Sequence, residues 1–366
     1  MYEYDKRVVL TLDAGGTNFV FSAIQGNNEM ISPIGLPAVS DNLDECLEVL
    51  VKGFDRVIAA IPVPPVAISF AFPGPADYEN GIIGDLPNFP SFRGGVALGP
   101  FLKHKYGIPV FIENDGNLFA YGEALSGALP MINRELSLAG CSREYKNLIG
   151  ITLGTGFGAG VVINKVLLTG DNGCGGDIWL MRNKKYPDML AEESVSIRAV
   201  RRVYSDLSGQ SSASLSPKDI YDIAEGIKEG DSHAAIASFN ELGIMAGAAI
   251  ASVLNVVDGL VVIGGGVAGA SKYILPALIT ELRAQLTTFS GNKFPCVSMQ
   301  VYNGEDESER ARFLSLSDSQ VVIPGTHLTT TYHQLKQTWV LCSKEGASRS
   351  IMRGAYAYAL QKIDLT

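Results

Sequence analysis

The chain has 366 residues, of which 46% are hydrophobic and 18% charged, and its net charge is −9. This length exceeds what one hydrophobic core supports, so we expect two domains, and the apolar content excludes a disordered chain. The negative charge and the scattered Lys and Arg residues argue against a nucleic-acid-binding protein.

The cysteines and the apolar runs indicate the cellular compartment of the protein. The five cysteines stand far apart without a CxxC pair, which excludes a cysteine-based zinc cluster and indicates reduced thiols. Residues 1–7 are charged and do not form a signal peptide. The longest apolar run, residues 244–257, is shorter than the ~20 residues that a membrane span needs. We therefore expect a cytoplasmic protein that binds neither membranes nor nucleic acids.

The first third of the chain begins with a glycine-rich hairpin. Residues 8–12 form an apolar run that ends at Asp13, and a glycine turn separates it from a second run, residues 19–23. A helix (43–52), a strand (66–70), a Pro/Gly loop (73–90) and another helix (100–106) follow. The strand at 110–113 then leads through Asn114 and Asp115 into a helix at 118–125.

The rest of the chain repeats this opening. A strand at 148–153 runs into the glycine turn 154–160 and a further strand, 161–163. We expect helices at 192–203, 217–229, 234–257, 271–286 and 347–362, and strands at 260–263 and 296–302. Alternating strands and helices predict an α/β fold with mixed sheets. We predict domains at residues 1–122, joined by the C-terminal helix (347–366), and 123–346.

The two glycine turns are candidate phosphate-binding loops. Glycine turns bring backbone N–H groups close to phosphate oxygens, and threonine adds a hydroxyl donor. Asp13, at a strand end beside such a turn, could hold hydrated Mg²⁺ against a nucleotide. Either turn alone is equally well explained as an ordinary hairpin. Their corresponding positions favour phosphate binding by residues Gly15, Gly16, Thr17, Gly154, Thr155 and Gly156.

Two other phosphate-binding motifs, the Walker-type loop and the GxGxxG dinucleotide motif, are alternatives to the hairpins. No glycine in the sequence belongs to the GxxxxGK[ST] pattern that a Walker-type loop requires. Gly264, Gly266 and Gly269 fit GxGxxG, but that motif expects an acidic residue about 20 positions later. Glu305, the acid after the next strand, comes 41 residues after Gly264. This spacing argues against a dinucleotide-dependent dehydrogenase.

Asp115 is the candidate catalytic base. Ligands of open α/β sheets gather at the carboxyl ends of strands, where Asn114 and Asp115 follow a buried strand. Phosphoryl transfer needs a base near the attacking hydroxyl, and Asp115 could supply it while Asn114 and Asn117 orient hydroxyls. Asp115 could also simply cap the following helix, and the two roles are compatible.

In this order, the motifs resemble those of the ROK family, which belongs to the sugar kinase/actin/Hsp70 superfamily. The matching stretches are residues 12–18, 72–77, 87–88, 113–117, 153–160 and 263–267. The resemblance implies two ribonuclease-H-like (actin-like ATPase) domains with an inter-domain cleft, and an ATP-dependent sugar kinase that uses Mg²⁺.

The resemblance also implies residue roles. Asp13 would hold the metal through water, and Gly265 and Gly266 would pass near the adenosine. Asp115 would be the general base. Asn88 and Asn114 would bind sugar hydroxyls, and the loop at Gly74 would line one side of the sugar site.

The stretch after the second hairpin departs from the family pattern. Family members usually carry Gly-Glu-x-Gly-His there, with a zinc-binding histidine, whereas this chain has Gly-Asp-Ile-Trp-Leu at residues 176–180, and residues 181–191 contain no Cys or His. We therefore expect no structural zinc. Asp177 and Glu192 are the expected acidic sugar contacts. Trp179 could stack on a sugar face, but we expect it to fill the vacated core.

These departures leave an alternative: a non-catalytic sugar or nucleotide sensor on the same fold. Residues 129–145 and 303–341 have no evident counterpart in the family and are expected to be surface elaborations or oligomer contacts. The small-molecule partner expected is a sugar, and a homodimer is the default for such folds.

Overall fold

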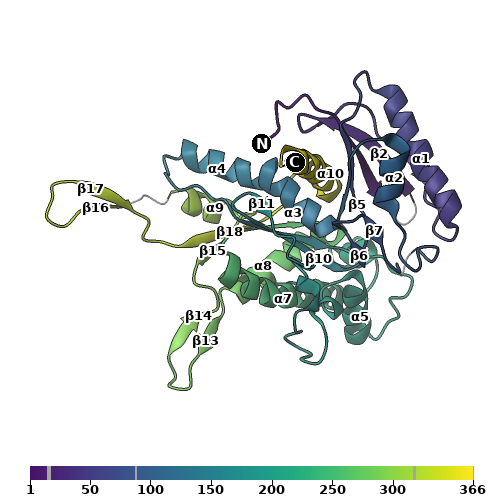
Figure 1. The fold of residues 1–366 in the computed structure, drawn as a ribbon. Helices are drawn as coiled ribbons and strands as arrows, with labels where there is room; N and C mark the ends of the chain where they lie inside the picture. The colour runs from purple at the N-terminus through teal and green to yellow at the C-terminus, as the bar shows by residue number, and fades with distance from the viewer. Residues whose placement is uncertain (15–17, 87–88, 316–318, 366) are drawn as a thin grey trace. The chain divides into compact units, whose positions relative to one another are not determined.

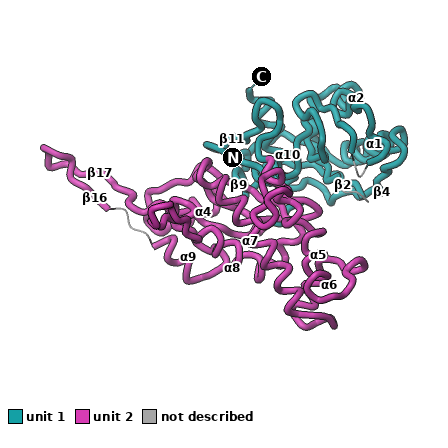
Figure 2. The backbone as a smooth tube through the Cα atoms, turned by 90° about the horizontal axis from the view of Figure 1, so that it is seen from below, with its two compact units in different colours: residues 1–127, 160–176, 345–366 teal, residues 128–159, 177–344 magenta. Residues whose placement is uncertain are grey.

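The computed structural model describes residues 1–14, 18–86, 89–315 and 319–365 (Figure 1). It divides into two compact units (Figure 2). The first unit contains residues 1–127, 160–176 and 345–366, and the second contains 128–159 and 177–344. Each unit is described by itself.

The first unit is built on a mixed sheet. Its strands are β1 (Val9–Ala14), β2 (Asn18–Gln25), β3 (Asn28–Glu29), β4 (Ile34–Pro37), β5 (Ala67–Ala71) and β8 (Val110–Glu113). Their order is β3-β2-β1-β5-β8, with β4 on β2. β1 and β2 form the expected antiparallel hairpin, whereas β1, β5 and β8 run parallel. The carboxyl ends of these three strands therefore meet at one edge.

Helices cover the two faces of this sheet. On one face, α1 (Leu43–Ala60) and α2 (Leu98–Tyr106) bury Leu50, Phe54 and Leu102 against strand residues such as Phe21. On the other, α10 (Ala347–Asp364) packs Tyr356 and other side chains against β1 and β5. Short strands β6 (Ala76–Asp77), β7 (Ile82–Ile83) and β11 (Val166–Leu167) complete the unit.

Two glycines allow α10 to cross α3 (Asp115–Leu125) at very short range. A Cβ on Gly122 would lie 1.9 Å from the carbonyl oxygen of Ser350, and one on Gly354 would lie 1.9 Å from that of Leu118. Only glycine fits at these positions without moving the backbone. The helix that begins at Asp115 is thereby held directly against the C-terminal helix.

The second sheet repeats this plan. Its strands are β9 (Leu148–Leu153), β10 (Phe157–Ile163), β12 (Leu260–Gly264), β15 (Gln300–Asn303) and β18 (Gln337–Cys342), in the order β11-β10-β9-β12-β18-β15. β9, β12, β18 and β15 run parallel. The order β10-β9-β12-β18 matches β2-β1-β5-β8 of the first sheet, so both halves follow one topology.

Helices of the second unit surround a long apolar helix. They are α4 (Ala128–Leu138), α5 (Ile197–Ser208), α6 (Pro217–Ala224), α7 (Ser232–Val257), α8 (Ser271–Leu282) and α9 (Glu307–Leu314), with 3-10 turns η1 (Ile178–Leu180), η2 (Ala191–Glu193) and η3 (Gly266–Ala270). With 26 residues, α7 is long and apolar enough to cross a membrane, and it extends beyond the run noted in the sequence. Its Phe239, Leu242 and Ile250 are buried, and it packs against α5, α6 and α8, so it is a core helix.

Part of one segment expected at the surface is core. Residues 337–341 belong to β18, which lies between β12 and β15 and buries Trp339. The expectation of a surface elaboration over 303–341 is therefore wrong for this strand. Two small hairpins, β13 (Gln285–Thr287) with β14 (Lys293–Pro295) and β16 (Ser319–Val322) with β17 (Thr329–Tyr332), are exposed.

Candidate active site

Strand register aligns three positions at one edge of the first sheet. Asp13 pairs with Ala71 of β5, and Ala71 pairs with Glu113 of β8. Asp13 is half-buried, and its turn partners Gly15, Gly16 and Thr17 lie outside the described residues. Because Asp115 follows Glu113 by two positions, the sheet brings Asp13 and Asp115 to the same edge of the first unit.

Asp115 opens helix α3, and the helix cap is its neighbour Asn114. The Asn114 Oδ1 accepts a hydrogen bond from the Gly116 N–H at 2.8 Å, and the backbone of Asn114 is extended, as in an N-cap residue. Asp115 Oδ1 also accepts from the Gly116 N–H, at 2.8 Å. The N-cap position that the sequence offered to Asp115 is thus filled by Asn114.

The electrostatic surroundings of Asp115 weaken its acidity. Burial raises the pKa of the Asp115 carboxyl, hydrogen bonding to the Gly116 N–H opposes the increase, and the charge of nearby Asp13 adds to it. Protein atoms surround the carboxylate densely, yet Asp115 as a whole residue is exposed to solvent. Because water reaches it, the effect of burial is moderated. The result is a solvent-accessible carboxylate with raised basicity.

Two buried polar residues, Glu113 and Asn117, support the junction of β8 and α3, and no role was predicted for Glu113. Glu113 is 3% exposed, and its Oε1 accepts from the Asn114 backbone N–H at 2.8 Å and from Asn117 Nδ2 at 3.1 Å. Asn117 is 2% exposed, so the expectation that it orients substrate hydroxyls is wrong. The sequence pattern that could have pointed to Glu113 is an acidic residue at the end of an otherwise apolar strand. These bonds fix the strand–helix junction that presents Asp115.

The other predicted residues of the first unit lie in loops. Gly74 is exposed in the loop between β5 and β6, where the Tyr78 hydroxyl donates to the carbonyl of Phe72 at 3.0 Å. A Cβ on Gly74 would lie 3.1 Å from that hydroxyl. Asn88 lies outside the described residues.

In the second unit, the glycine turn 154–156 is fastened to a segment some 35 residues away. The Phe157 N–H donates to Glu192 Oε2 at 3.0 Å, and the Ile197 N–H donates to the Gly154 carbonyl at 2.9 Å. A Cβ on Gly156 would lie 2.5 Å from Glu192 Oε2. The structure thus brings the predicted turn residues Gly154, Thr155 and Gly156 together with Glu192.

Glu192 is itself held by an arginine. Its Oε1 accepts from Arg198 at 3.1 Å, and Arg198 also pairs with Glu193 at 3.2 Å. The Glu192 side chain is 21% exposed and that of Glu193 is 47% exposed. The two oxygens of Glu192 therefore have different partners, the glycine turn and an arginine.

Gly265 lies against the end of β9. Its φ is +92°, and a Cβ there would lie 2.3 Å from the carbonyl oxygen of Leu153. Gly266, which begins η3, has open space around it. The residue before the turn, Leu153, and Gly265 are thus packed backbone to backbone, an approach that only glycine allows.

Asp177 and Trp179 lie on an exposed loop of the second unit. The Trp179 ring N–H donates to Asp177 Oδ1 at 3.1 Å, and the Trp179 side chain is 37% exposed. The expectation that Trp179 fills the core is wrong. The loop reaches η2, which carries Glu192, through the Ala191 N–H bonded to the Met181 carbonyl at 2.7 Å.

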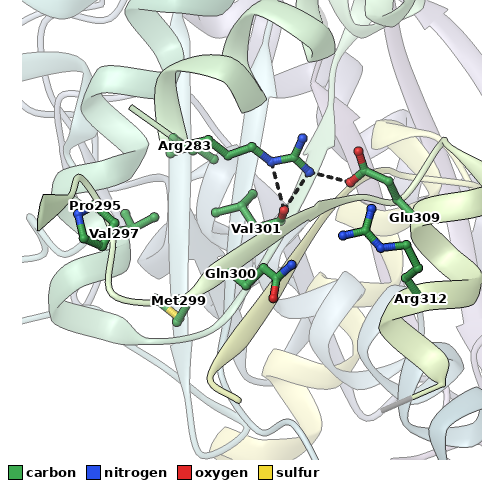
Figure 3. A pocket seen from close by; sticks show the side chains of 9 residues that line it. Arg283, Pro295, Val297, Met299, Gln300, Val301, Glu309 and Arg312 are labelled. Atoms are coloured by element: carbon green, nitrogen blue, oxygen red, sulfur yellow. Dashed lines mark hydrogen bonds and ion pairs between the residues drawn. The ribbon is translucent and has the colours of Figure 1, made fainter. Parts of the chain in front are cut away.

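Hollows elsewhere contain none of the predicted site residues. A pocket of about 300 Å³ in the second unit is lined by Arg283, whose guanidinium donates to the Val301 carbonyl and pairs with Glu309 (Figure 3). A groove beside α1 and α2 in the first unit has about 850 Å³. Across the described residues, no cluster of three or more His, Cys, Asp or Glu side chains is arranged to hold a metal.

Comparisons with known proteins agree with the fold and the motifs. Residues 9–308 match the ROK family. The crystal structure of a glucokinase from Parabacteroides distasonis is 58% identical, covers 99% of both chains and has a TM-score of 0.89. The glucokinase of Thermotoga maritima is 26% identical over 290 residues, 75% of this chain and 86% of that protein. A ROK glucokinase from Streptomyces griseus, solved with glucose and AMPPNP, shares the fold at 18% identity, with a TM-score of 0.62 over 96% of this chain and 98% of that one.

The chain belongs to the ROK family. Within it, the chain is a glucokinase-like sugar kinase, an ATP-dependent phosphotransferase with two mixed α/β sheets. The non-catalytic sensor considered from the sequence is therefore not retained.

Proposed function

We propose that this kinase transfers the γ-phosphoryl group of ATP to a hydroxyl of glucose or a closely related hexose, with Asp115 as general base. The observation that carries the proposal is the state of Asp115: Asn114 supplies the N-cap, solvent reaches the Asp115 carboxylate, and its pKa is raised. The choice of glucose is supported by the name of the 58% identical relative.

The proposed chemistry at Asp115 is a single proton transfer. As the sugar oxygen forms its bond to phosphorus and the bond from phosphorus to the ADP oxygen breaks, the hydroxyl proton passes to the carboxylate. A raised pKa makes this carboxylate a stronger base than an ordinary aspartate. The Asn114 Oδ1 is engaged in the cap, so its contact with a sugar hydroxyl would come from the Nδ2 donor.

Asp13 fits a magnesium ion held through water. It is a half-buried carboxylate at a strand end, and Mg²⁺ prefers carboxylate, phosphate and water oxygens. When bound, the ion would neutralise charge on the transferred phosphoryl group. The proposed nucleotide contacts are Asp13, Gly15, Gly16, Thr17, Gly154, Thr155, Gly156, Gly265 and Gly266, and the proposed sugar contacts are Gly74, Asn88, Asn114, Asp177 and Glu192.

We also place the enzyme in the cytoplasm. The proposal is supported by the five free cysteines, of which Cys46 is fully buried, in a chain whose sequence shows no disulfide framework. The domain division predicted from the sequence, with its boundary after residue 122, stays a prediction.

The test replaces the proposed base by its neutral isostere. We expect Asp115→Asn to lower kcat by about 10²-fold or more, the range for loss of a general base. The matched control, Asp41→Asn, changes an exposed loop aspartate and should leave kcat unchanged. Sugar-dependent ADP release is measured over a panel of hexoses, with nucleotide binding measured separately. An Asp115→Asn enzyme that retains normal kcat rules out the assignment of the base, and a preference for a sugar that is neither glucose nor a closely related hexose rules out the substrate.

A further inference from the structure

An exposed hairpin of the second unit, residues 319–335, is the feature from which we argue; we name it the arm. Strands β16 and β17 pair antiparallel, with Val321 opposite Thr330 and Val322 opposite Thr329. The ladder is closed by the Ile323 N–H, which donates to the Leu328 carbonyl at 2.8 Å. In both views the arm extends away from the rest of its unit (Figures 1 and 2).

The two faces of the arm differ in polarity. In an antiparallel pair, opposite residues share a face and successive residues alternate between faces. The register therefore places Val321, Ile323, Leu328 and Tyr332 on one face, which we call the apolar face and which also carries Ser319 and Thr330. Gln320, Thr329 and Thr331 share the opposite face with Val322.

The apolar face is open to solvent. Val321 is 41% exposed, Ile323 38%, Leu328 67% and Tyr332 50%. Alternation of apolar and polar residues is the pattern of a strand with one buried face, and a two-stranded ribbon alone is marginally stable in water. The pattern therefore requires a surface that covers this face.

The charge of the arm favours a second copy of the chain as that surface. Residues 319–335 contain no Asp, Glu, Lys or Arg, in a chain whose net charge is −9. When two identical surfaces meet across a two-fold axis, a surface that carries charge of one sign meets the same sign on its copy and is repelled. A ribbon without charged side chains avoids this repulsion, and its alternating apolar residues are complementary to themselves.

The area of the apolar face is in the range that such a contact needs. If a fully exposed residue of this kind offers on the order of 200 Å², a value in the range that aromatic side chains bury, the four residues present roughly 400 Å² of surface at most. A standard interface takes about 800 Å² from each partner, of which somewhat more than half is non-polar. The arm therefore matches the non-polar part of one side of an interface.

We propose that the arm is a dimerisation element whose apolar face packs against the same face of a second copy of this chain. Two ribbons stacked in this way bury the four apolar side chains of each copy and leave the polar faces in water. The proposal does not depend on the sugar or on the identity of the catalytic base.

The test compares two lysine substitutions on the same ribbon. Leu328→Lys changes the apolar face, and its matched control, Val322→Lys, changes the opposite face at a similar exposure, 63% against 67%. Both sites are exposed, so both variants should fold, which far-UV circular dichroism and thermal unfolding verify. Sedimentation velocity over a concentration series measures the dimer, at twice the 39.0 kDa of one chain.

We expect the wild type and Val322→Lys to be dimers at micromolar concentration. We expect Leu328→Lys to raise the dissociation constant by about 100-fold or more, because its charge would be buried in the interface. A monomeric wild type, or equal effects of the two substitutions, overturns the proposal.

Cysteine cross-linking provides a second measurement. Thr330 lies on the apolar face and its neighbour Thr329 on the polar face. A short bismaleimide should link Thr330→Cys chains into dimers above the wild-type background and should not link Thr329→Cys chains. Equal linking of both variants would contradict face-to-face packing.

Discussion

The contact between Glu192 and the glycine turn gives a prediction whose size follows from the structure. Glu192→Ala removes a carboxylate that accepts the Phe157 N–H at 3.0 Å and pairs with Arg198 at 3.1 Å. A hydrogen bond to a charged group is worth about 1.5–3 kcal/mol, and an exposed ion pair adds about 1 kcal/mol at most. Since the Arg198 side chain is 55% exposed, most of the loss comes from the turn. We expect the free energy of unfolding to fall by about 2–3 kcal/mol.

The neighbouring residue is a natural control. Glu193 also pairs with Arg198, at 3.2 Å, but its side chain is 47% exposed and bonds to this arginine rather than to the turn. Glu193→Ala should therefore cost less than about 1 kcal/mol. Denaturant unfolding of both variants measures the difference. If the turn binds nucleotide as proposed, the KM for ATP should rise in Glu192→Ala and stay unchanged in Glu193→Ala. Equal stability of the two variants would refute the role of the Phe157 contact.

Three further predictions concern stability. Gly265→Ala combines a φ of +92° with a Cβ 2.3 Å from the Leu153 carbonyl oxygen, so it should lower the free energy of unfolding by about 3 kcal/mol or more. Gly266→Ala, whose new Cβ would enter open space, should lower it by less than about 1 kcal/mol. Similar melting temperatures for the two variants would disprove the contact. Because the pKa of Asp115 is raised in the folded state, its charge opposes folding at neutral pH, so Asp115→Asn should be more stable than the wild type there and lose this advantage as the pH falls through the raised pKa. A stability difference that does not change between neutral and acidic pH would contradict this. Thr11 is fully buried and its hydroxyl finds no hydrogen-bond partner within the part of the chain that the structure describes, so Thr11→Val should be neutral or stabilising by about 1 kcal/mol. Thr338→Val, which loses a 2.7 Å bond to the Gly259 carbonyl, should destabilise by about 1–2 kcal/mol. Thermal unfolding checks both, and equal losses would mean that the Thr11 hydroxyl is satisfied.

Local signals predicted the mixed α/β fold and both glycine hairpins. The pattern that predicts each hairpin is local: an apolar run, a glycine turn and a second apolar run follow one another directly. No contact between distant residues is needed to recognise it. Helix α10 was predicted at 347–362 and is observed at Ala347–Asp364. The strand β18 was missed because Gln337 and Thr338 are polar, although both are buried in the sheet beside Trp339.

The site was predictable only as separate pieces. Asp13, Asn114 and Asp115 stand out because each follows a strand, and register then aligns the strand ends. The bond from Phe157 to Glu192 spans 35 positions, and no periodicity reports such a pair. Trp179 was misjudged because large aromatic residues are usually buried, whereas this ring makes a polar bond to Asp177 on a surface loop. The roles of these residues in binding and catalysis stay predictions.

The crossing of α3 and α10 at Gly122 and Gly354 has a consequence for biosynthesis. The ribosome releases residues 1–127 long before residues 345–366 are made, yet both belong to one compact unit. The flank of α3 therefore stays uncovered until residues 345–366 have been made, and in that interval chaperones and proteases compete for it. A nonsense codon between β18 and α10 would remove a wall of the first unit, although every strand of both sheets would still be made, so it should act as a complete loss of the enzyme.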